Sequence, residues 1–359
     1  MGFIKGMDLC AGFFCDVAKP LLDRHYPLLE YSVGLLGYGS DVLGYDDEIS
    51  ADHMWGPRFY LFLKVQDIHR KNDIMDLFSS EFPYVYKGYS VNFASPDDAG
   101  IRCPELITDG IVSPLVYIHT IEEYLTDYLG TANLENLTEL DWLSFSEHRL
   151  LALTSGKLFH DGLGIASTLR TLRNYPEDVR LYLIACNWSL IAEEQAFMRR
   201  CYDVADRIGS SLVCGRIIDR LMRLVFLYGK QYAPFSKWFG TAFMQLPVSE
   251  NIKQAISEVI TTTNIDEREQ HLVKAQLLVA ELHNSSGITE PVEVHIESYY
   301  NRQIKVIFAD KIVHAVLLKL AGTAFEKYPL IGTLSQVPNF TNAFDDPQRR
   351  ASIKALYTG

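Results

Sequence analysis

Several features that assign a protein to a class at a glance are missing from this sequence. Its 359 residues include six cysteines, but no two of them form a CxxC pair. No stretch of about 18 residues is continuously apolar, and the first residues do not follow the pattern of a signal peptide. We therefore expect a cytoplasmic protein with buried, reduced thiols and without a membrane-spanning segment.

Positive charge is also scarce. Lysine and arginine number 33 against 45 aspartates and glutamates, which gives a formal net charge of −12. An extended nucleic-acid surface requires a broad positive face, so we do not expect one here. The charge still permits one small anionic ligand in a local basic pocket.

The hydrophobic fraction of 48% is that of a globular protein with a substantial core, and the length suggests two domains. The first third of the chain mixes short helical and strand-like segments. Helical spacing marks residues 7–24 and 67–79. Strand-like runs rich in branched and aromatic residues occupy 31–38, 58–65, 91–94 and 115–120.

The pattern becomes helical from Ile121 onward. The longest expected helix spans 176–208, a second spans 211–228, and others lie near Asn251, Glu267 and Ile312. The sequence thus predicts an α+β protein. A small mixed-sheet domain is expected over residues 1–129 and an all-helical domain over residues 130–359.

The most informative stretch lies between the first two expected strands. Gly37 lies at the end of the first strand, Gly39 and Ser40 follow that strand, and Asp52 stands before the second. Glycines let backbone N–H groups approach a phosphate without an intervening Cβ, and Ser40 adds a hydroxyl donor. A carboxylate near the next strand can bind Mg²⁺, which bridges phosphate oxygens. This order indicates a phosphate-binding turn with a metal-binding acid, whereas a Gly-Ser pair alone is more often a plain turn.

The same order resembles the DNA polymerase beta-like nucleotidyltransferase superfamily, in which a hydrophobic-Gly-Gly/Ser turn precedes an acid-x-acid pair at the start of a strand. Gly39, Ser40 and Asp52 match that pattern. Residues 37–63, His160-Asp161-Gly162 and residues 232–243 are also similar to a bacterial domain-of-unknown-function family of two-domain proteins assigned to this superfamily.

The resemblance implies a nucleotidyltransferase-like fold and a reaction. The reaction is Mg²⁺- or Mn²⁺-dependent transfer of a nucleoside monophosphate from an NTP, such as ATP, to the hydroxyl of an unknown acceptor. Asp52 would be the catalytic, metal-binding acid, and Gly39 and Ser40 would hold the phosphates. Because the turn is expected at the surface, Ser40→Ala and Gly39→Val should weaken NTP binding without unfolding the protein.

The pattern departs from the superfamily at its second acid. Position 54 is methionine, and a thioether is a poor ligand for Mg²⁺. Asp52 and Met54 are expected to share one face of a strand, because side chains alternate with a period of two. The third acid is expected near residues 115–120, which contain His119 but no carboxylate. The alternative is therefore a catalytically weak or inactive protein of the same fold that binds a nucleotide or another small ligand.

Three further residues carry imidazole or carboxylate groups that could bind a metal ion or take part in catalysis. His53 adjoins Asp52 in the sequence. His160 and Asp161 are expected either in a cleft between the domains or at a helix end, with Asp161 capping the next helix. A metal phosphohydrolase would need additional histidines and aspartates at helical spacing, and the sequence shows no matching set.

Basic side chains of the helical domain complete the candidates. Arg216, Arg220 and Arg223 recur on one helix face, where Arg220 could bind a triphosphate. The alternative is ion pairing with acids of the preceding helix, which are Glu193, Glu194, Asp203 and Asp206. Lys237 is expected either to reach a phosphate or to be solvated beside a packed Trp238. An aminoglycoside as acceptor would require an acidic cleft, which the net charge permits.

Overall fold

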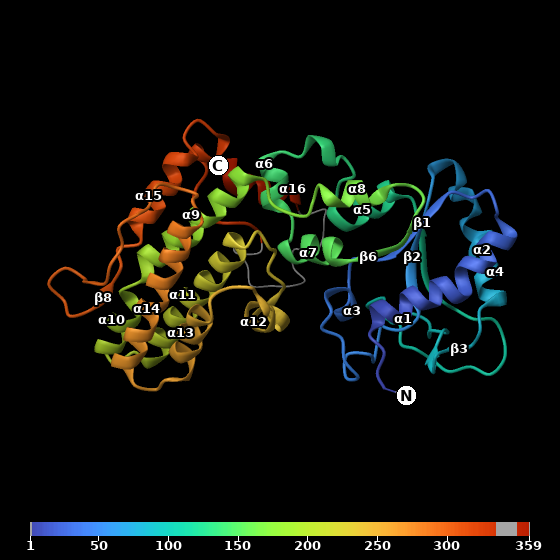
Figure 1. The fold of residues 1–359 in the computed structure, drawn as a ribbon, viewed down its shortest axis with the longest axis horizontal. Coiled ribbons are helices and arrows are strands. Elements are labelled where there is room, and N and C mark those ends of the chain that lie inside the picture. The colour runs from blue at the N-terminus through green and yellow to red at the C-terminus, as the bar shows by residue number, and fades with distance from the viewer. Residues whose placement is uncertain (1, 335–349, 359) are drawn as a thin grey trace. The chain divides into compact units, whose positions relative to one another are not determined.

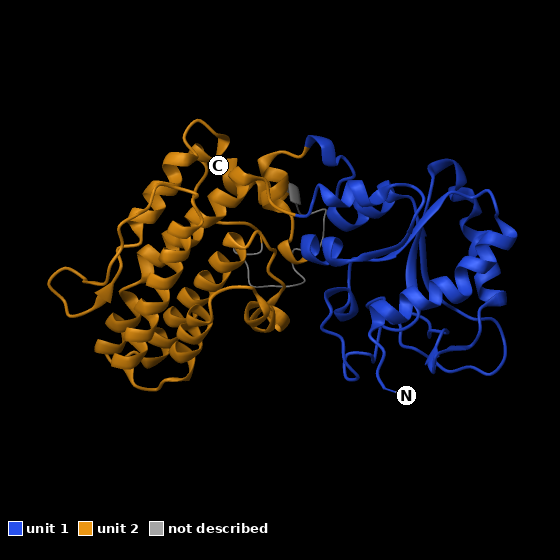
Figure 2. Ribbon diagram, viewed as in Figure 1, with its two compact units in different colours: residues 1–136, 149–173 blue, residues 137–148, 174–359 orange. Residues whose placement is uncertain are grey.

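The computed structural model describes residues 2–334 and 350–358 (Figure 1). The chain forms two compact units, each assembled from two stretches of sequence (Figure 2). Unit 1 comprises Met1–Asn136 and Arg149–Arg173, and unit 2 comprises Leu137–His148 and Asn174–Gly359. The predicted α+β class is confirmed, because unit 1 contains a mixed sheet and the described part of unit 2 is mostly helical.

Unit 1 is built on a four-stranded sheet in the order β5-β2-β1-β6. Strands β2 and β6 run antiparallel to β1, and β5 runs parallel to β2. A separate two-stranded hairpin joins β3 to β4. The strands are β1 (Tyr31–Leu35), β2 (Arg58–Leu63), β3 (Val85–Tyr86), β4 (Tyr89–Ser90), β5 (Leu115–His119) and β6 (Lys157–Asp161).

Helices cover both faces of this sheet. Figure 1 shows α1, α2 and α4 on one side and α5 on the other. The helical elements are α1 (Gly6–Phe13), the π-helix η1 (Phe14–Ala18), α2 (Lys19–His25), α3 (Ser40–Leu43), the 3-10 helix η2 (Val65–Arg70), α4 (Lys71–Glu81), α5 (Ile121–Leu129), the 3-10 helix η3 (Leu134–Asn136) and α8 (Ile165–Arg170). Helix α7 (Glu147–Ser155) begins in the last residues of one unit-2 stretch.

The central strand β2 is buried on both faces, which is why it reads as a continuous apolar run. Phe59 and Leu61 join the core formed with α1, α2 and α4. Tyr60 and Phe62 point the other way and pack on Tyr124 of α5, with ring centroids 5.0 and 5.4 Å apart. The period-two alternation of β2 thus separates two aromatic layers.

The chain returns to the sheet of unit 1 well after residue 129, where the sequence predicted that the first domain ends. Strand β6 pairs with β1, with His160 opposite Val33 and Leu158 opposite Gly34. A Cβ at Gly34 would lie 2.7 Å from the Lys157 carbonyl oxygen, so glycine is required for this close approach. Unit 1 therefore extends to Arg173, beyond the boundary expected after residue 129.

Two predicted elements also differ. Residues 91–94 form no strand and contribute one isolated bridge, between Phe93 and Pro104. The single helix expected over 176–208 is divided, with interruptions at 195–196 and 204–206. At the second interruption the Asp206 side chain accepts a hydrogen bond from the Gly209 N–H and starts a new helix.

The described part of unit 2 packs its long helices around α9 and α11, with one short hairpin, β7–β8. No described helix has the length and apolar character needed to cross a membrane. The elements are α6 (Glu139–Ser144), α9 (Glu177–Glu194), α10 (Phe197–Asp203), α11 (Arg207–Tyr228), α12 (Ser236–Gln245), α13 (Glu250–Thr261), α14 (Ile265–Ser285), β7 (Glu297–Ser298), β8 (Lys305–Val306), α15 (Asp310–Lys319), the 3-10 helix η4 (Ala324–Lys327) and α16 (Arg350–Thr358).

Candidate functional site

The Gly-Ser turn directly follows β1 and leads into the short helix α3. Gly37 and Gly39 have φ angles of 85° and 121°, which a side chain would strain. The Gly37 N–H donates to the Ala152 carbonyl at 3.2 Å. The N–H groups of Gly39 and Ser40 and the Ser40 hydroxyl have no hydrogen-bond partner among the described residues. The turn therefore presents a small group of donors.

A buried ion pair lies directly behind this turn. Arg58, the first residue of β2, binds Asp41 through its Nη2 at 2.8 Å and its Nε at 3.2 Å. The same Nη2 donates to the Tyr38 carbonyl at 3.0 Å. Both charged side chains are 1% exposed. Burial disfavours the charged guanidinium, but the Asp41 carboxylate together with Tyr38 and Cys10 outweighs this effect, and the pKa of Arg58 is raised.

Tyrosines surround the other side of Arg58. Its guanidinium carbon lies 4.4 Å from the centroid of the Tyr38 ring, and the Tyr38 and Tyr117 hydroxyls are 3.0 Å apart. The Tyr60 ring stacks on Tyr117, with centroids 5.0 Å apart. Burial raises the pKa of Tyr38 and Tyr60. Arg58 and Tyr60 thus lie at the beginning of β2, and Tyr117 lies in the middle of β5.

Asp52 lies outside the strand on which the superfamily pattern would place it. Residues 51–54 form turns and bends, and β2 begins only at Arg58. The Asp52 side chain is 66% exposed, and its Oδ1 lies 2.8 Å from Nδ1 of His53, which is 53% exposed. The expectation that Asp52 and Met54 share one face of a strand is therefore wrong.

Met54 has its own structural role. Its φ angle is 50°, and its backbone N–H donates to the Arg102 carbonyl at 2.8 Å. The Met54 sulfur accepts a hydrogen bond from the Arg102 N–H at 3.2 Å. Met54 thus joins its own loop to the loop around Arg102, so replacing it by aspartate would not complete an acid pair on a strand.

A carboxylate not selected as a candidate, Asp46, is fixed inside unit 1. It is 1% exposed and accepts hydrogen bonds from the Gly6 N–H at 2.7 Å and from Nε1 of Trp55 at 3.2 Å. Lys5 lies 3.4 Å away. Asp46 therefore ties the loop between β1 and β2 to the start of α1.

His160 and Asp161 lie on β6, within unit 1. The His160 ring packs against Tyr31, with centroids 4.7 Å apart. Asp161 accepts hydrogen bonds from the Ser32 hydroxyl at 2.8 Å and from the N–H groups of Ile165 and Ala166 at 2.8 and 3.1 Å. Burial raises the pKa of Asp161, but these hydrogen bonds outweigh it and the net shift is downward. Asp161 thus accepts from the first N–H groups of α8, as one sequence interpretation expects, but it ends a strand and not the helix that this interpretation placed before Gly162.

The arginine face of α11 is largely engaged in ion pairs. Arg216 binds Glu194 at 2.6 Å, and Arg223 binds Asp219 at 3.0 Å and Glu147 at 3.4 Å. Arg220 is mostly buried, its Nε lies 3.8 Å from Asp219, and burial lowers its pKa. Ion pairing therefore accounts for the outer two arginines.

Lys237 stands at the start of α12 and is exposed. Its Nζ lies 5.1 Å from the centroid of the neighbouring Trp238 ring. A cation over an indole face is a favourable contact, so the side chain already has a structural role.

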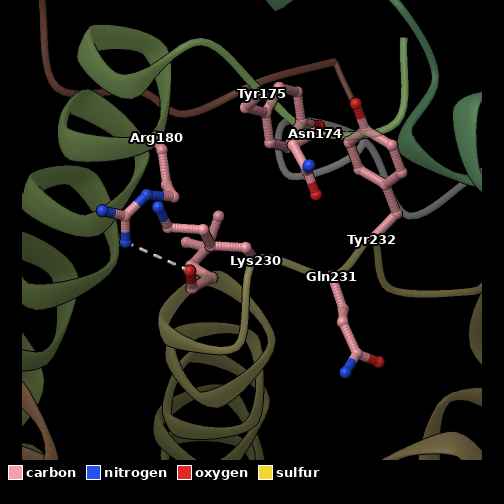
Figure 3. Close-up of a pocket in the computed structure, with 7 residues that line it drawn as sticks. Asn174, Tyr175, Arg180, Lys230, Gln231 and Tyr232 are labelled. Atoms are coloured by element: carbon pink, nitrogen blue, oxygen red, sulfur yellow. Dashed lines mark hydrogen bonds between the residues drawn. The ribbon is translucent and has the colours of Figure 1, made fainter. Parts of the chain in front are cut away.

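A small cavity in unit 2 is lined by Tyr232 and by polar side chains of α9 and of the chain that follows α11 (Figure 3). Arg180 donates from Nη1 to the Leu227 carbonyl at 3.3 Å, and the buried Tyr175 hydroxyl has no partner among the described residues. The volume of about 10 Å³ suits one water molecule and excludes a nucleotide.

The candidates of unit 1 lie in two different parts of its chain. Gly39, Ser40, Asp52 and His53 lie between β1 and β2, whereas His160 and Asp161 lie on β6. Arg220 and Lys237 belong to unit 2. Within the described ranges, no three histidine, cysteine, aspartate or glutamate side chains are grouped so as to hold a metal ion.

Comparison with known proteins finds a family model and similar solved structures. Residues 142–239 match a family model described as a domain of unknown function, DUF4037. This confirms, over that range, the resemblance to a family of unknown function. A nucleotidyltransferase-like protein from Exiguobacterium sibiricum 255-15 has a similar solved structure at 8% identity, with 81% of this chain and 97% of that chain covered and a TM-score of 0.32. No curated protein matches the chain.

Proposed function

We propose that unit 1 binds a nucleoside triphosphate, with its phosphates on the Gly37–Ser40 turn. The observation that carries the proposal is the set of donors at Gly39 and Ser40, which have no partner among the described residues. Backbone N–H groups in a glycine-rich turn bind phosphate oxygens, and the Ser40 hydroxyl adds one more hydrogen bond. The ion pair of Arg58 and Asp41 holds the turn in place from behind.

Two-metal catalysis does not fit the residues present. It requires two or three carboxylates converging on the cations. The start of β2 carries Arg58 and Tyr60, β5 carries Tyr117 and His119, and the neighbouring Asp41 is committed to Arg58. We therefore derive no transfer step, and the function we propose is nucleotide binding.

A single divalent cation fits better than a pair. Mg²⁺ is commonly held by one or two carboxylates together with substrate phosphates and water. Asp52 is exposed and follows the turn along the chain, so we propose that its carboxylate contributes one ligand to a Mg²⁺ or Mn²⁺ carried by the triphosphate. The cation would neutralise phosphate charge near an otherwise acidic protein.

Calorimetric titration with ATP, GTP, CTP and UTP, with and without Mg²⁺, tests this proposal. Ser40→Ala should weaken the binding of the preferred NTP about fivefold, since one hydrogen bond is lost. Ser211→Ala, which alters an exposed serine on α11, is the matched control and should leave the affinity unchanged. Equal affinities in the wild type and Ser40→Ala would remove the turn from the site.

The transferase alternative is tested in the same samples by measuring pyrophosphate release. Transfer of a nucleoside monophosphate releases one pyrophosphate for each turnover. We expect none above the background of the NTP alone. Sustained release that Asp52→Asn abolishes would replace our proposal with the catalytic function that the sequence resemblance implies.

A further inference from the structure

A cavity in unit 1 is lined by no residue of the Gly37–Ser40 turn. It has a volume of about 280 Å³ and is lined by residues from three loops or hairpins. The lining residues are Ala51, Trp55, Gly56, Gly88, Tyr89, Ser90, Pro104 and Leu106. The size and the largely apolar, aromatic lining are those of a pocket for a small molecule.

The aromatic part of this cavity is held rigidly. Trp55 stacks on Phe3 with centroids 5.3 Å apart, meets Tyr89 edge-on at 5.1 Å, and donates from Nε1 to Asp46 at 3.2 Å. The Tyr89 hydroxyl accepts a hydrogen bond from the Ile4 N–H at 3.1 Å. Because both rings are fixed from behind, the cavity does not have to form when a ligand arrives.

One lining residue, Gly56, is held in a conformation that favours glycine. Gly56 has a φ of 135°, and a Cβ there would lie 3.1 Å from the Phe93 ring. Ser90 contributes no free hydroxyl proton, since it donates to the Glu105 carbonyl at 2.7 Å. The lining therefore offers aromatic and aliphatic surface and few hydrogen bonds, which favours a ligand with an apolar body.

The surrounding chain is strongly acidic. Residues 44–57 contain Asp46, Asp47, Glu48 and Asp52 without any lysine or arginine. Residues 94–113 contain Asp97, Asp98, Glu105 and Asp109 against one arginine. Asp52 adjoins the lining residue Ala51, and Glu105 stands between the lining residues Pro104 and Leu106. Both carboxylates are on exposed residues.

The cations in the same neighbourhood are engaged. Lys87, which precedes Gly88, lies 3.7 Å from Asp16, and its Nζ is 5.0 Å from the Tyr86 ring centroid. Arg102 donates to the Ala94, Phe93 and Pro114 carbonyls. Lys5 lies 3.4 Å from the buried Asp46. Nδ1 of His53 lies 2.8 Å from Asp52, whereas no ion pair involves Glu105 among the described residues. The negative potential of the two carboxylates is therefore only partly offset.

We propose that this cavity binds a small organic cation: an ammonium group attached to an apolar body. The body contacts Trp55, Tyr89 and Leu106, and the positive charge is stabilised by the aromatic faces and by Asp52 and Glu105. This binding uses none of the donors of the Gly37–Ser40 turn, and it shares only Asp52 with the function proposed above.

The test is calorimetric titration with three probes of similar size and different charge, in the absence of nucleotide. Benzyltrimethylammonium should bind at least about fivefold more tightly than neutral benzyl alcohol, and benzoate should bind least. Raising the ionic strength from about 0.05 M to about 0.3 M should weaken the cation's binding and leave that of benzyl alcohol unchanged.

Variants that remove the two carboxylates test whether they stabilise the bound cation. Asp52→Asn combined with Glu105→Gln should weaken benzyltrimethylammonium about fivefold. Glu281→Gln, an exposed carboxylate of α14 in unit 2, is the matched control and should have no effect. Benzyl alcohol binding as tightly as the cation, or no binding of any probe, would overturn the proposal. Since no nucleotide is present, such a result leaves the function proposed for the turn untouched.

Discussion

Gly39 connects the proposed phosphate site to the core of unit 1. A Cβ at this position would lie 2.1 Å from Oδ1 of Asp41 and 2.5 Å from Nη2 of Arg58. Any side chain at residue 39 therefore displaces a buried ion pair. Ser40 has no such constraint, because its hydroxyl makes no hydrogen bond to a described residue. The sequence predicted that both Ser40→Ala and Gly39→Val would weaken NTP binding without unfolding the protein. Only Ser40→Ala is now expected to change the affinity for NTP without also lowering the free energy of unfolding.

This difference gives a prediction about stability. Gly39→Ala should lower the free energy of unfolding by about 3 kcal/mol, because it adds a clash to a strained φ angle. Gly44→Ala is the control, since Gly44 also has a positive φ of 78° but its Cβ would meet nothing within 4 Å. It should cost about 1 kcal/mol. Urea unfolding of both variants measures the difference, and equal losses would show that the ion pair tolerates a side chain at residue 39.

Asp161 gives a second residue-scale prediction, on pH dependence. Its folded pKa is lowered, so its contribution to stability is present above the unfolded pKa and is lost as pH falls through the folded pKa. At neutral pH, Asp161→Ala should lower the free energy of unfolding by about 1 kcal/mol, the usual value of a helix cap. The difference between the wild type and the variant should narrow as pH falls through the folded pKa of Asp161, which lies below the usual aspartate value, because the carboxyl then becomes protonated in both states of the wild type.

Denaturant unfolding at several pH values checks this prediction. Asp161→Asn is the control, since an amide oxygen can still cap α8 but does not titrate. Its stability relative to Asp161→Ala should not change between neutral and acidic pH. A difference between the wild type and Asp161→Ala that persists undiminished in acid would show that the carboxylate charge is not what stabilises α8.

At the scale of elements, local patterns identified the strands and helices that carry dense apolar sequence. Strand β2 was recognisable because Arg58–Leu63 is aromatic and branched almost throughout. Strand β6 was not, because Lys157–Asp161 is half-exposed and its pairing with β1 links residues more than a hundred positions apart. Residues 91–94 read as a strand from composition, yet no neighbouring strand is available to them.

In the candidate site, too, local sequence signals predicted one part of the structure and missed another. The Gly-Ser turn was found at its predicted place because β1, glycine and the helix start are local signals. The role of Asp52 was inferred from spacing along the chain, and spacing does not show where a strand begins. Here the loop continues through Trp55 and Gly56, so β2 starts six residues after Asp52, at Arg58. A charged residue opening an otherwise apolar strand was the available sign that Arg58 has a buried partner.

At the scale of the whole molecule, the division into units predicts which fragments fold. Residues 1–129 lack β6, which leaves one edge of β1 without its partner strand. This fragment should show no cooperative unfolding transition, whereas residues 1–173, which restore β6 and α8, should show one. Circular dichroism during thermal unfolding distinguishes the two. A cooperative transition in the shorter fragment would show that β6 is dispensable and that the chain divides where its sequence suggests.

The central claim is that the Gly37–Ser40 turn holds the phosphates of a nucleotide, and amide hydrogen exchange measures this directly. The Gly39 and Ser40 N–H groups have no partner among the described residues, so they should exchange rapidly in the free protein. Saturating ATP with Mg²⁺ should slow exchange in a peptide spanning residues 36–44, and adenosine, which lacks phosphates, should not. Unchanged exchange in this peptide with ATP, or equal protection by adenosine, would contradict the account.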